Sequence, residues 1–140
     1  MSQTDCLICR IGAGEMPSAR VLETPEVVAF MDLRQPQPGH VLVVPRAHYA
    51  GLAELPAELA AALIQAAQRL AGALYRTLFP DGISLSLADR AAAGQELMHV
   101  HLHLRPRAAG DGMITIKAGE PADPAALKAL AVRIRAGLQE

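Results

Sequence analysis

The chain has 140 residues, of which 51% are apolar, and its formal net charge at pH 7 is −1. This length supports one hydrophobic core, so we expect residues 1–140 to form a single domain. The nearly neutral charge offers no basic face for a nucleic acid, and no apolar run is long enough to span a bilayer. The opening residues MSQTD lack the regions of a signal peptide, and two closely spaced cysteines are unlike a disulfide framework. We therefore predict a cytoplasmic protein with no nucleic-acid or membrane partner.

Short β-prone segments fill the first third of the chain. Val21-Leu22 and Val27 to Met31 are separated by Thr24-Pro25-Glu26, a pattern that predicts a hairpin with a short loop. The segment VLVV, residues 41–44, follows a turn that is rich in proline and predicts a buried strand that ends at Pro45.

A long helix is predicted in the middle of the chain. Its apolar side chains recur at spacings of three and four residues and form one stripe, made of Leu59, Leu63, Ala66, Leu70 and Leu74. Pro56 suits the first turn of this helix, and Pro80-Asp81-Gly82 ends it.

The last third predicts two more strands and a final helix. Residues 83–87 alternate between apolar and polar side chains, and residues 98–106 alternate again after a loop at 90–95. Asp123 is the expected N-cap of the last helix, with Pro124 as its first residue. Four apolar side chains of that helix are expected to face the core, namely Leu127, Leu130, Ile134 and Leu138. The order of elements predicts an α+β fold, with a mostly antiparallel sheet of about five strands and helices on one face.

Three of the chain's five histidines lie at every second position in the segment MHVHLHLRP. In a strand, His99, His101 and His103 would share one face over roughly 13 Å, and the apolar residues between them would face the core. We call these three residues the histidine row. One interpretation is a solvated strand face, and a second is a metallohydrolase, because His-x-His on a strand can hold zinc. Residues 97–110 contain no carboxylate, which zinc hydrolases usually use. We favour a third interpretation, attack of the neutral His101 imidazole on phosphorus.

The chain resembles the histidine triad family of nucleotide-binding proteins, whose signature alternates three histidines with apolar residues. His99 to Leu104 fit the signature, and Arg105 departs from its final apolar position. The resemblance also covers CLICRIGAGEMPS near the start and AFMDLRQPQPGHVLVVPRAH, residues 29–48. It implies an antiparallel α+β fold, a homodimer, and transfer or hydrolysis of a nucleotidyl group through a covalent nucleotidyl-histidine intermediate.

The resemblance also implies roles for individual residues. His101 matches the nucleophile, and His103 matches a group that holds the α-phosphate, together with Gln95 and the backbone of Gly94. Asp32 matches the carboxylate that accepts hydrogen bonds from both ribose hydroxyls, although it could simply begin a turn. Apolar residues that could equally be plain core match the walls around the base, namely Leu7, Ile8, Ile11, Phe30 and Leu33. Two departures are Ala88, where many members have Asn, and Glu96, where phosphoramidate hydrolases have Ser or Thr.

Cys6 and Cys9 have the spacing of half a zinc site. His48 and His99 are the best candidates for the two remaining ligands, and the resemblance implies that they complete a structural Cys2His2 site. Two buried thiols or a redox pair are the alternatives. Zinc bound by His99 would leave His101 and His103 for phosphate.

We expect a purine nucleotide-binding hydrolase that acts on nucleoside 5′-phosphoramidates or related adenylates. One alternative is a dinucleoside polyphosphate hydrolase, against which Glu96 counts because a carboxylate near the leaving group repels polyphosphate. The other alternative is a nucleotide-sensing module with little turnover, to which Ala88 points.

Overall fold

The computed structural model describes residues 5–112 and 119–138. Five strands form one antiparallel sheet in the order β1-β2-β3-β5-β4, which confirms the predicted α+β fold. The strands are β1 (Arg20–Glu23), β2 (Val27–Met31), β3 (Val41–Pro45), β4 (Gly82–Ser86) and β5 (Leu102–Arg107). The helices are α1 (Leu7–Gly12), α2 (Ala57–Leu78) and α3 (Pro124–Gly137), with short 3-10 turns at Leu52–Glu54 and Ala91–Ala93. None of the described helices is long and apolar enough to cross a membrane.

The strand pairing follows the hydrophobic pattern of the sequence. The predicted hairpin is present, since β1 pairs with β2, and β2 then pairs with β3 along its full length. The central strand β3 pairs on its other side with β5, where Val41 lies opposite Leu104 and Leu42 lies opposite His103. β4 completes the sheet beside β5, and Ser86 lies opposite His103.

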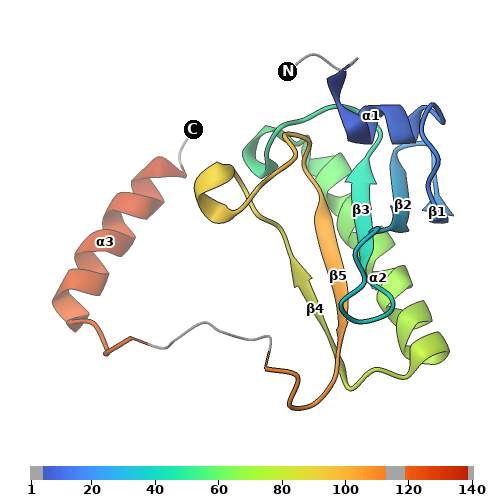
Figure 1. Cartoon of the computed structure of the whole chain (residues 1–140). Helices are drawn as coiled ribbons and strands as arrows, with labels where there is room; N and C mark the ends of the chain where they lie inside the picture. Colours follow the sequence, from blue (N-terminus) through green and yellow to red (C-terminus); the bar gives the residue numbers. More distant parts are fainter. Residues whose placement is uncertain (1–4, 113–118, 139–140) are drawn as a thin grey trace.

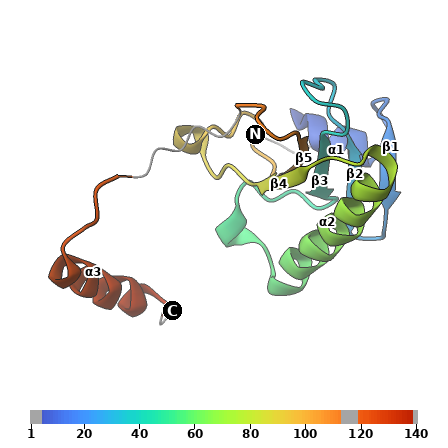
Figure 2. The same ribbon diagram turned by 90° about the horizontal axis from the view of Figure 1, so that it is seen from below.

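Helices cover both faces of the sheet, so the expectation that they share one face is wrong (Figures 1 and 2). The apolar stripe of α2 packs on one face in a core that includes Leu63, Leu70 and Leu104. The short helix α1 packs on the opposite face, where Ile8 and Ile11 contact Phe30 and the neighbouring strand residues. The strands β2 and β3 have apolar side chains on both faces, and each face therefore recruits its own helix.

The boundaries of α2 follow from proline and from a left-handed residue. Pro56 precedes the first turn, as predicted, and its missing N–H leaves no donor unpaired there. The helix ends at Phe79, which adopts a left-handed backbone with φ 51°, one residue before the predicted Pro80-Asp81-Gly82 stop.

Gly39 brings the loop after β2 against the end of α2. Its φ of 103° lies in the left-handed region, and a Cβ at this position would lie 2.6 Å from Leu78 Cδ1 and 2.8 Å from Pro106 Cγ. Only glycine allows both this backbone and this close approach. The next residue, His40, is thereby placed at the start of β3.

The helix α3 begins where the sequence predicts but does not pack where the sequence predicts. Asp123 caps it by accepting a hydrogen bond from the Ala125 amide, and Pro124 follows. No residue of α3 is buried, and the helix stands away from the sheet in both ribbon views (Figures 1 and 2). The expectation that its apolar side faces the core is therefore wrong, because Leu127, Leu130 and Ile134 are about half exposed.

Candidate active site

The histidine row does not lie wholly in a strand. β5 begins at Leu102, so His99 and His101 precede it and only His103 belongs to it. The amide of Val100 donates to the carbonyl of Tyr49 (2.7 Å), a loop residue, instead of joining the sheet. This part of the prediction is wrong because a contact far along the sequence bends the chain before β5. The apolar residues between the histidines are buried as predicted.

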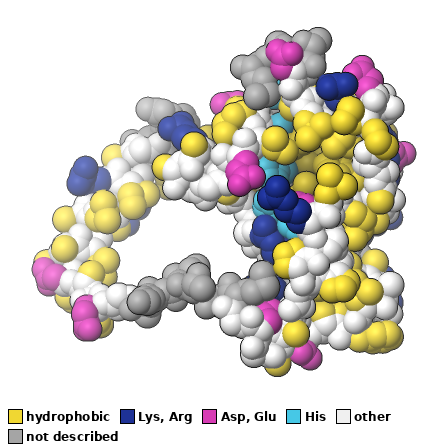
Figure 3. Space-filling model, in the orientation of Figure 1, with side chains coloured by type: hydrophobic (Ala, Val, Ile, Leu, Met, Phe, Trp, Pro, Cys, Tyr) yellow, Lys and Arg dark blue, Asp and Glu magenta, His cyan; other side chains and the backbone are white. Residues whose placement is uncertain are grey.

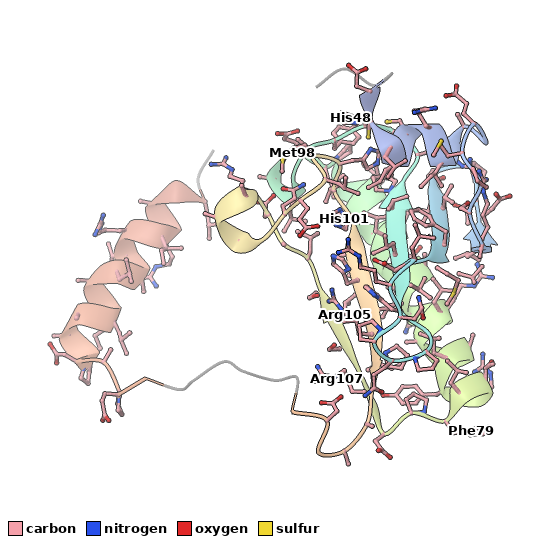
Figure 4. All side chains as sticks on the ribbon, viewed as in Figure 1. His48, Phe79, Met98, His101, Arg105 and Arg107 are labelled. Carbon is pink, nitrogen blue, oxygen red and sulfur yellow. The ribbon has the colours of Figure 1, made fainter. Side chains whose placement is uncertain are left out.

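The ring of His101 has a defined orientation. Its Nδ1 lies 2.8 Å from the backbone oxygen of His99. A carbonyl oxygen only accepts hydrogen bonds, so Nδ1 carries the proton and Nε2 keeps its lone pair. His101, which Figure 4 labels, is 8% exposed. The centroid of its ring lies 4.8 Å from that of His103. The row therefore presents a nucleophilic nitrogen next to a second imidazole.

His103 lies opposite Leu42, so its side chain is on the face of the sheet that α1 covers. Its Nδ1 is 3.0 Å from His40 Nε2 and 3.3 Å from Arg105 Nη2. Because a guanidinium only donates, the Arg105 contact makes Nδ1 an acceptor and places the ring proton on Nε2. Burial, followed by the positive charge of Arg105, lowers the pKa of His103 to about 4. His103 is consequently neutral at pH 7.

His40 joins the site without having been predicted to do so. It is buried, and its Nδ1 lies 3.3 Å from the carbonyl of Arg34 and 3.7 Å from Asp32 Oδ2. Burial and the nearby Arg105 lower its pKa, although Asp32 opposes that effect. The sequence contains no local sign of this role, because it arises only when β3 pairs with β5.

The loop between β2 and β3 is held by the amide of Gln35. Its Oε1 accepts from the backbone amides of Gly39 (2.8 Å) and His40 (3.1 Å), and its Nε2 donates to the carbonyl oxygens of Asp32 (2.6 Å) and His40 (2.9 Å). The Asp32 carboxylate is fixed in turn, since Oδ1 accepts from the Arg34 amide at 2.8 Å. Asp32 and His40 therefore have defined positions relative to the row.

A pocket of about 550 Å³ lies beside Asp32 on the same face of the sheet. All five residues predicted to surround a base line it, together with Asp32 and Glu96, and these five are Leu7, Ile8, Ile11, Phe30 and Leu33. Leu33 is 99% exposed, so its side chain is available to cover a ligand. Figure 3 shows the apolar surface of this region next to the histidines. The structure thus gathers residues from α1 and β2 that the resemblance assigns to nucleoside binding.

The loop predicted to hold phosphate is fixed by hydrogen bonds to other parts of the protein and within itself. The amide of Gly94 donates to Ala91 O (2.9 Å). The Gln95 side chain accepts from the Arg90 amide (2.7 Å) and donates to the carbonyl oxygens of Ala50 (2.7 Å) and Leu97 (2.9 Å). Gln95 therefore stabilises the segment that precedes the row, and its contact with phosphate stays a prediction.

Cys6, Cys9, His48 and His99 form a second cluster at the N-terminal end of α1. Their ligand atoms all lie within 4.8 Å of one another, and Cys9 Sγ is 3.4 Å from His48 Nδ1 and 3.5 Å from His99 Nδ1. Zinc bonds of about 2.3 Å to sulfur and 2.0 Å to nitrogen in a tetrahedron separate these atoms by about 3.5 Å. Three contacts between a cysteine sulfur and a histidine nitrogen, at 3.4–3.5 Å, therefore match the spacing in a tetrahedral zinc site.

The surroundings of this cluster also fit a metal ion. His99 is fully buried, and its Nε2 lies 2.8 Å from the carbonyl of Pro45, which turns the Nδ1 lone pair toward the cysteines. Burial, with Cys6 beside it, raises the pKa of the Cys9 thiol to about 11. A metal ion would replace that thiol proton and bind the thiolate.

The antiparallel sheet and the three alternating histidines that lead into its central region define a protein of the histidine triad class. The model of the HIT domain matches residues 13–110, and the chain belongs to the HIT family. Protein hit of Bacillus subtilis is 38% identical over 109 residues, which cover 77% of this chain and 75% of that protein. The adenylylsulfatase HINT3 of Arabidopsis thaliana is 32% identical over 105 residues, which cover 75% of this chain and 53% of that protein.

Solved structures agree with the fold. The crystal structure of SMU.412c from Streptococcus mutans UA159 has a TM-score of 0.93 and 35% identity, and the match covers 99% of this chain and 88% of that chain. A Zn-bound histidine triad family protein from Mycobacterium smegmatis has a TM-score of 0.76 and 30% identity, with 94% of this chain and 99% of that chain covered.

Proposed function

We propose that this protein is a purine nucleotide-binding hydrolase that acts on nucleoside 5′-phosphoramidates or related adenylates. The observation that carries the proposal is the His101 ring, whose Nδ1 is fixed on the His99 carbonyl so that Nε2 is a nucleophile beside His103. The relative named adenylylsulfatase HINT3 supports a reaction at an adenylate.

The nucleoside occupies the pocket beside α1 in this proposal. The purine base lies between Ile8 and Phe30, under the exposed side chain of Leu33. Asp32 accepts hydrogen bonds from the ribose hydroxyls, which suits an ionised carboxylate because it has no proton to donate. The α-phosphate then lies at His101 and His103, with the loop of Gly94 and Gln95 along its edge.

The reaction has two steps. In the first, His101 Nε2 attacks the α-phosphorus, the bond from phosphorus to the leaving group breaks, and a nucleotidyl-imidazole forms. An amine leaves with a proton, which His103 is placed to donate once the negative phosphate favours its charged form. In the second step, water gives a proton to the neutral His103 and its oxygen attacks phosphorus. The bond to His101 breaks, and the nucleoside monophosphate is released.

Zinc has a structural role in this proposal. Cys6, Cys9, His48 and His99 would hold it, and the Zn-bound relative from Mycobacterium smegmatis supports the assignment. The ion would cross-link the segments that carry its ligands. His99 is separated from the chemistry by one residue, so zinc would fix the start of the row while His101 and His103 act on phosphate.

We also propose that the working form is a homodimer in which α3 packs on a second copy of the chain. The apolar residues Leu127, Leu130 and Ile134 lie on one side of an amphipathic helix that nothing in the described chain buries. The match to the Streptococcus mutans crystal structure covers 99% of this chain, so it includes the region of α3. The exposed apolar side of α3 in this chain supports a covering partner.

The function is tested with His101→Ala. Steady-state turnover of adenosine 5′-phosphoramidate should fall at least about 10³-fold, because the covalent step is lost. Affinity for AMP should change less than about threefold, because the nucleophile acts chiefly in the transition state. Wild-type protein quenched in acid-free denaturant should carry AMP on His101 in peptide mass spectra.

Equal loss of activity in His99→Ala, His101→Ala and His103→Ala that zinc addition reverses would show a metallohydrolase instead. AMP binding by a wild-type protein that turns over no adenylate would show a sensing module.

A further inference from the structure

Arg105 is an isolated positive charge at the edge of the row. Its Nη1 donates to Ser86 Oγ (3.1 Å) on β4, and its Nη2 donates to His103 Nδ1 (3.3 Å). Within the described part of the chain, the ion pairs do not include Arg105. The next arginine on this face, Arg107, differs because it is paired with Asp111 at 2.7 Å. Figure 4 labels both side chains along β5, and Figure 3 shows basic side chains beside the histidines on this face.

The position of Arg105 is defined by the order of the strands. The nucleoside pocket lies over β2, β3 and α1, and His103 lies on β5. Arg105 leans from β5 toward β4, which is the strand on the other side of the row. A nucleotide with its base in the pocket and its α-phosphate at the row would therefore direct its leaving group toward Arg105.

An amine leaving group gains nothing from this arrangement. A guanidinium beside His103 opposes the imidazolium that would have to protonate the departing amine. An anionic leaving group does not depend on an imidazolium at His103. Sulfate or phosphate departs with the bonding electron pair and requires no proton at neutral pH. Two of the five guanidinium N–H groups make the contacts above, and a sulfate or phosphate can accept from the others in the bidentate manner that arginine favours.

We propose that Arg105 is a specificity-determining residue that binds a sulfate or phosphate leaving group, so that adenylates with an anionic leaving group are preferred over phosphoramidates. This inference rests on the proposed function and narrows its substrate class. His101 Nε2 attacks the α-phosphorus, the bond from phosphorus to the bridging oxygen breaks, and sulfate leaves with that oxygen and its electron pair. Water then gives a proton to neutral His103 and its oxygen attacks phosphorus, the bond from phosphorus to His101 Nε2 breaks, and AMP and neutral His101 are released.

The test compares adenosine 5′-phosphosulfate with adenosine 5′-phosphoramidate in wild type, Arg105→Leu, Arg105→Lys and Arg69→Leu. Leucine restores the apolar residue of the family signature, lysine restores the charge alone, and Arg69 is an exposed arginine on α2, on the opposite face of the sheet. For Arg105→Leu we expect kcat/KM for the phosphosulfate to fall at least about tenfold, the usual effect of one lost charge-assisted hydrogen bond. The value for the phosphoramidate should fall much less, because Arg105 affects that substrate only through the ring of His103 and not through the leaving group. Arg105→Lys should recover part of the loss, and Arg69→Leu should match wild type.

Binding supplies a second measurement that does not depend on turnover. In a His101→Ala background, calorimetry should give a ratio of phosphosulfate to AMP affinity that falls about tenfold on adding Arg105→Leu. If wild type hydrolyses neither substrate, the proposed catalytic function fails, while a lost affinity ratio still supports anion binding by Arg105. Equal changes for both substrates, or an unchanged affinity ratio, would overturn the assignment and leave Arg105 as a structural residue.

Discussion

The proton position on each histidine is set by a different neighbour, although the three residues belong to one repeated pattern. The Pro45 carbonyl fixes His99, the His99 carbonyl fixes His101, and Arg105 fixes His103. Each acceptor or donor leaves a different nitrogen available, so His99 offers Nδ1 to the sulfur cluster and His101 offers Nε2 to a substrate. Unequal roles along the row were predicted from the sequence. The groups that impose them could not be, because two are backbone oxygens that the fold brings into place.

The lowered pKa of His103 predicts a pH dependence of stability. Its pKa is 6.5 without the protein's influence and about 4 in the folded protein. Between these values the unfolded chain binds a proton that the folded chain does not, so the free energy of unfolding should decrease as the pH falls from 6.5 toward 4. Denaturant unfolding at several pH values should give a steeper decline for wild type than for His103→Asn. Loss of zinc in acid affects both proteins, so the difference between the curves isolates His103. Parallel curves would contradict the neutral, half-buried state of this ring.

At the scale of secondary-structure elements, α1 depends on contacts outside itself. A helix of six residues is too short to be stable alone. Arg46 donates to the Gly12 carbonyl at 3.1 Å and Arg20 donates to the Ile11 carbonyl, so both side chains satisfy acceptors at its C-terminal end. The cysteines at its N-terminal end reach His48 and His99. These contacts couple the wall of the proposed nucleoside pocket to the end of β3 and to the row.

The zinc proposal predicts that α1 and its contacts respond to metal removal. Protein purified without chelator should contain about one zinc per chain, and Cys9→Ser should lose it together with several kcal/mol of stability. Chelator should lower the melting temperature of wild type and leave that of Cys9→Ser unchanged, which separates metal loss from the loss of a buried thiol. A metal-free wild type whose melting temperature does not respond to added zinc would leave the cysteines as two buried thiols.

Elements whose signals are local were predicted well, and those that depend on distant contacts were not. β2 follows from a short apolar run that begins with two valines, and α2 follows from a regular apolar stripe. The start of β5 was misplaced because the Val100 amide binds Tyr49. α1 was not predicted because a segment of six residues is too short to establish a helical period. Likewise His40 and Arg105 enter the candidate site only through the pairing of β3, β5 and β4.

At the scale of the whole molecule, the local features of the helix α3 could be predicted from the sequence, and its packing could not. Its N-cap, Asp123, acts within one turn and could be predicted from the sequence. Its apolar stripe predicted that something covers the helix, but a stripe carries no information on whether the cover belongs to the same chain. The exposed leucines of α3 are the reason for placing a second copy of the chain against it.

The proposed dimer predicts that one charge in this stripe separates the subunits. Leu130→Glu should convert a dimer into a monomer in size-exclusion chromatography with light scattering, because a carboxylate buried between subunits would have no partner. Ala129→Glu is the matched control, because its side chain projects from the opposite side of α3 and should leave the dimer intact. Among the described residues, none of α3 is buried, so circular dichroism of the folded domain should be unchanged in both variants. A wild-type monomer at high micromolar concentration, or equal dissociation by both substitutions, would contradict packing of α3 on a second copy.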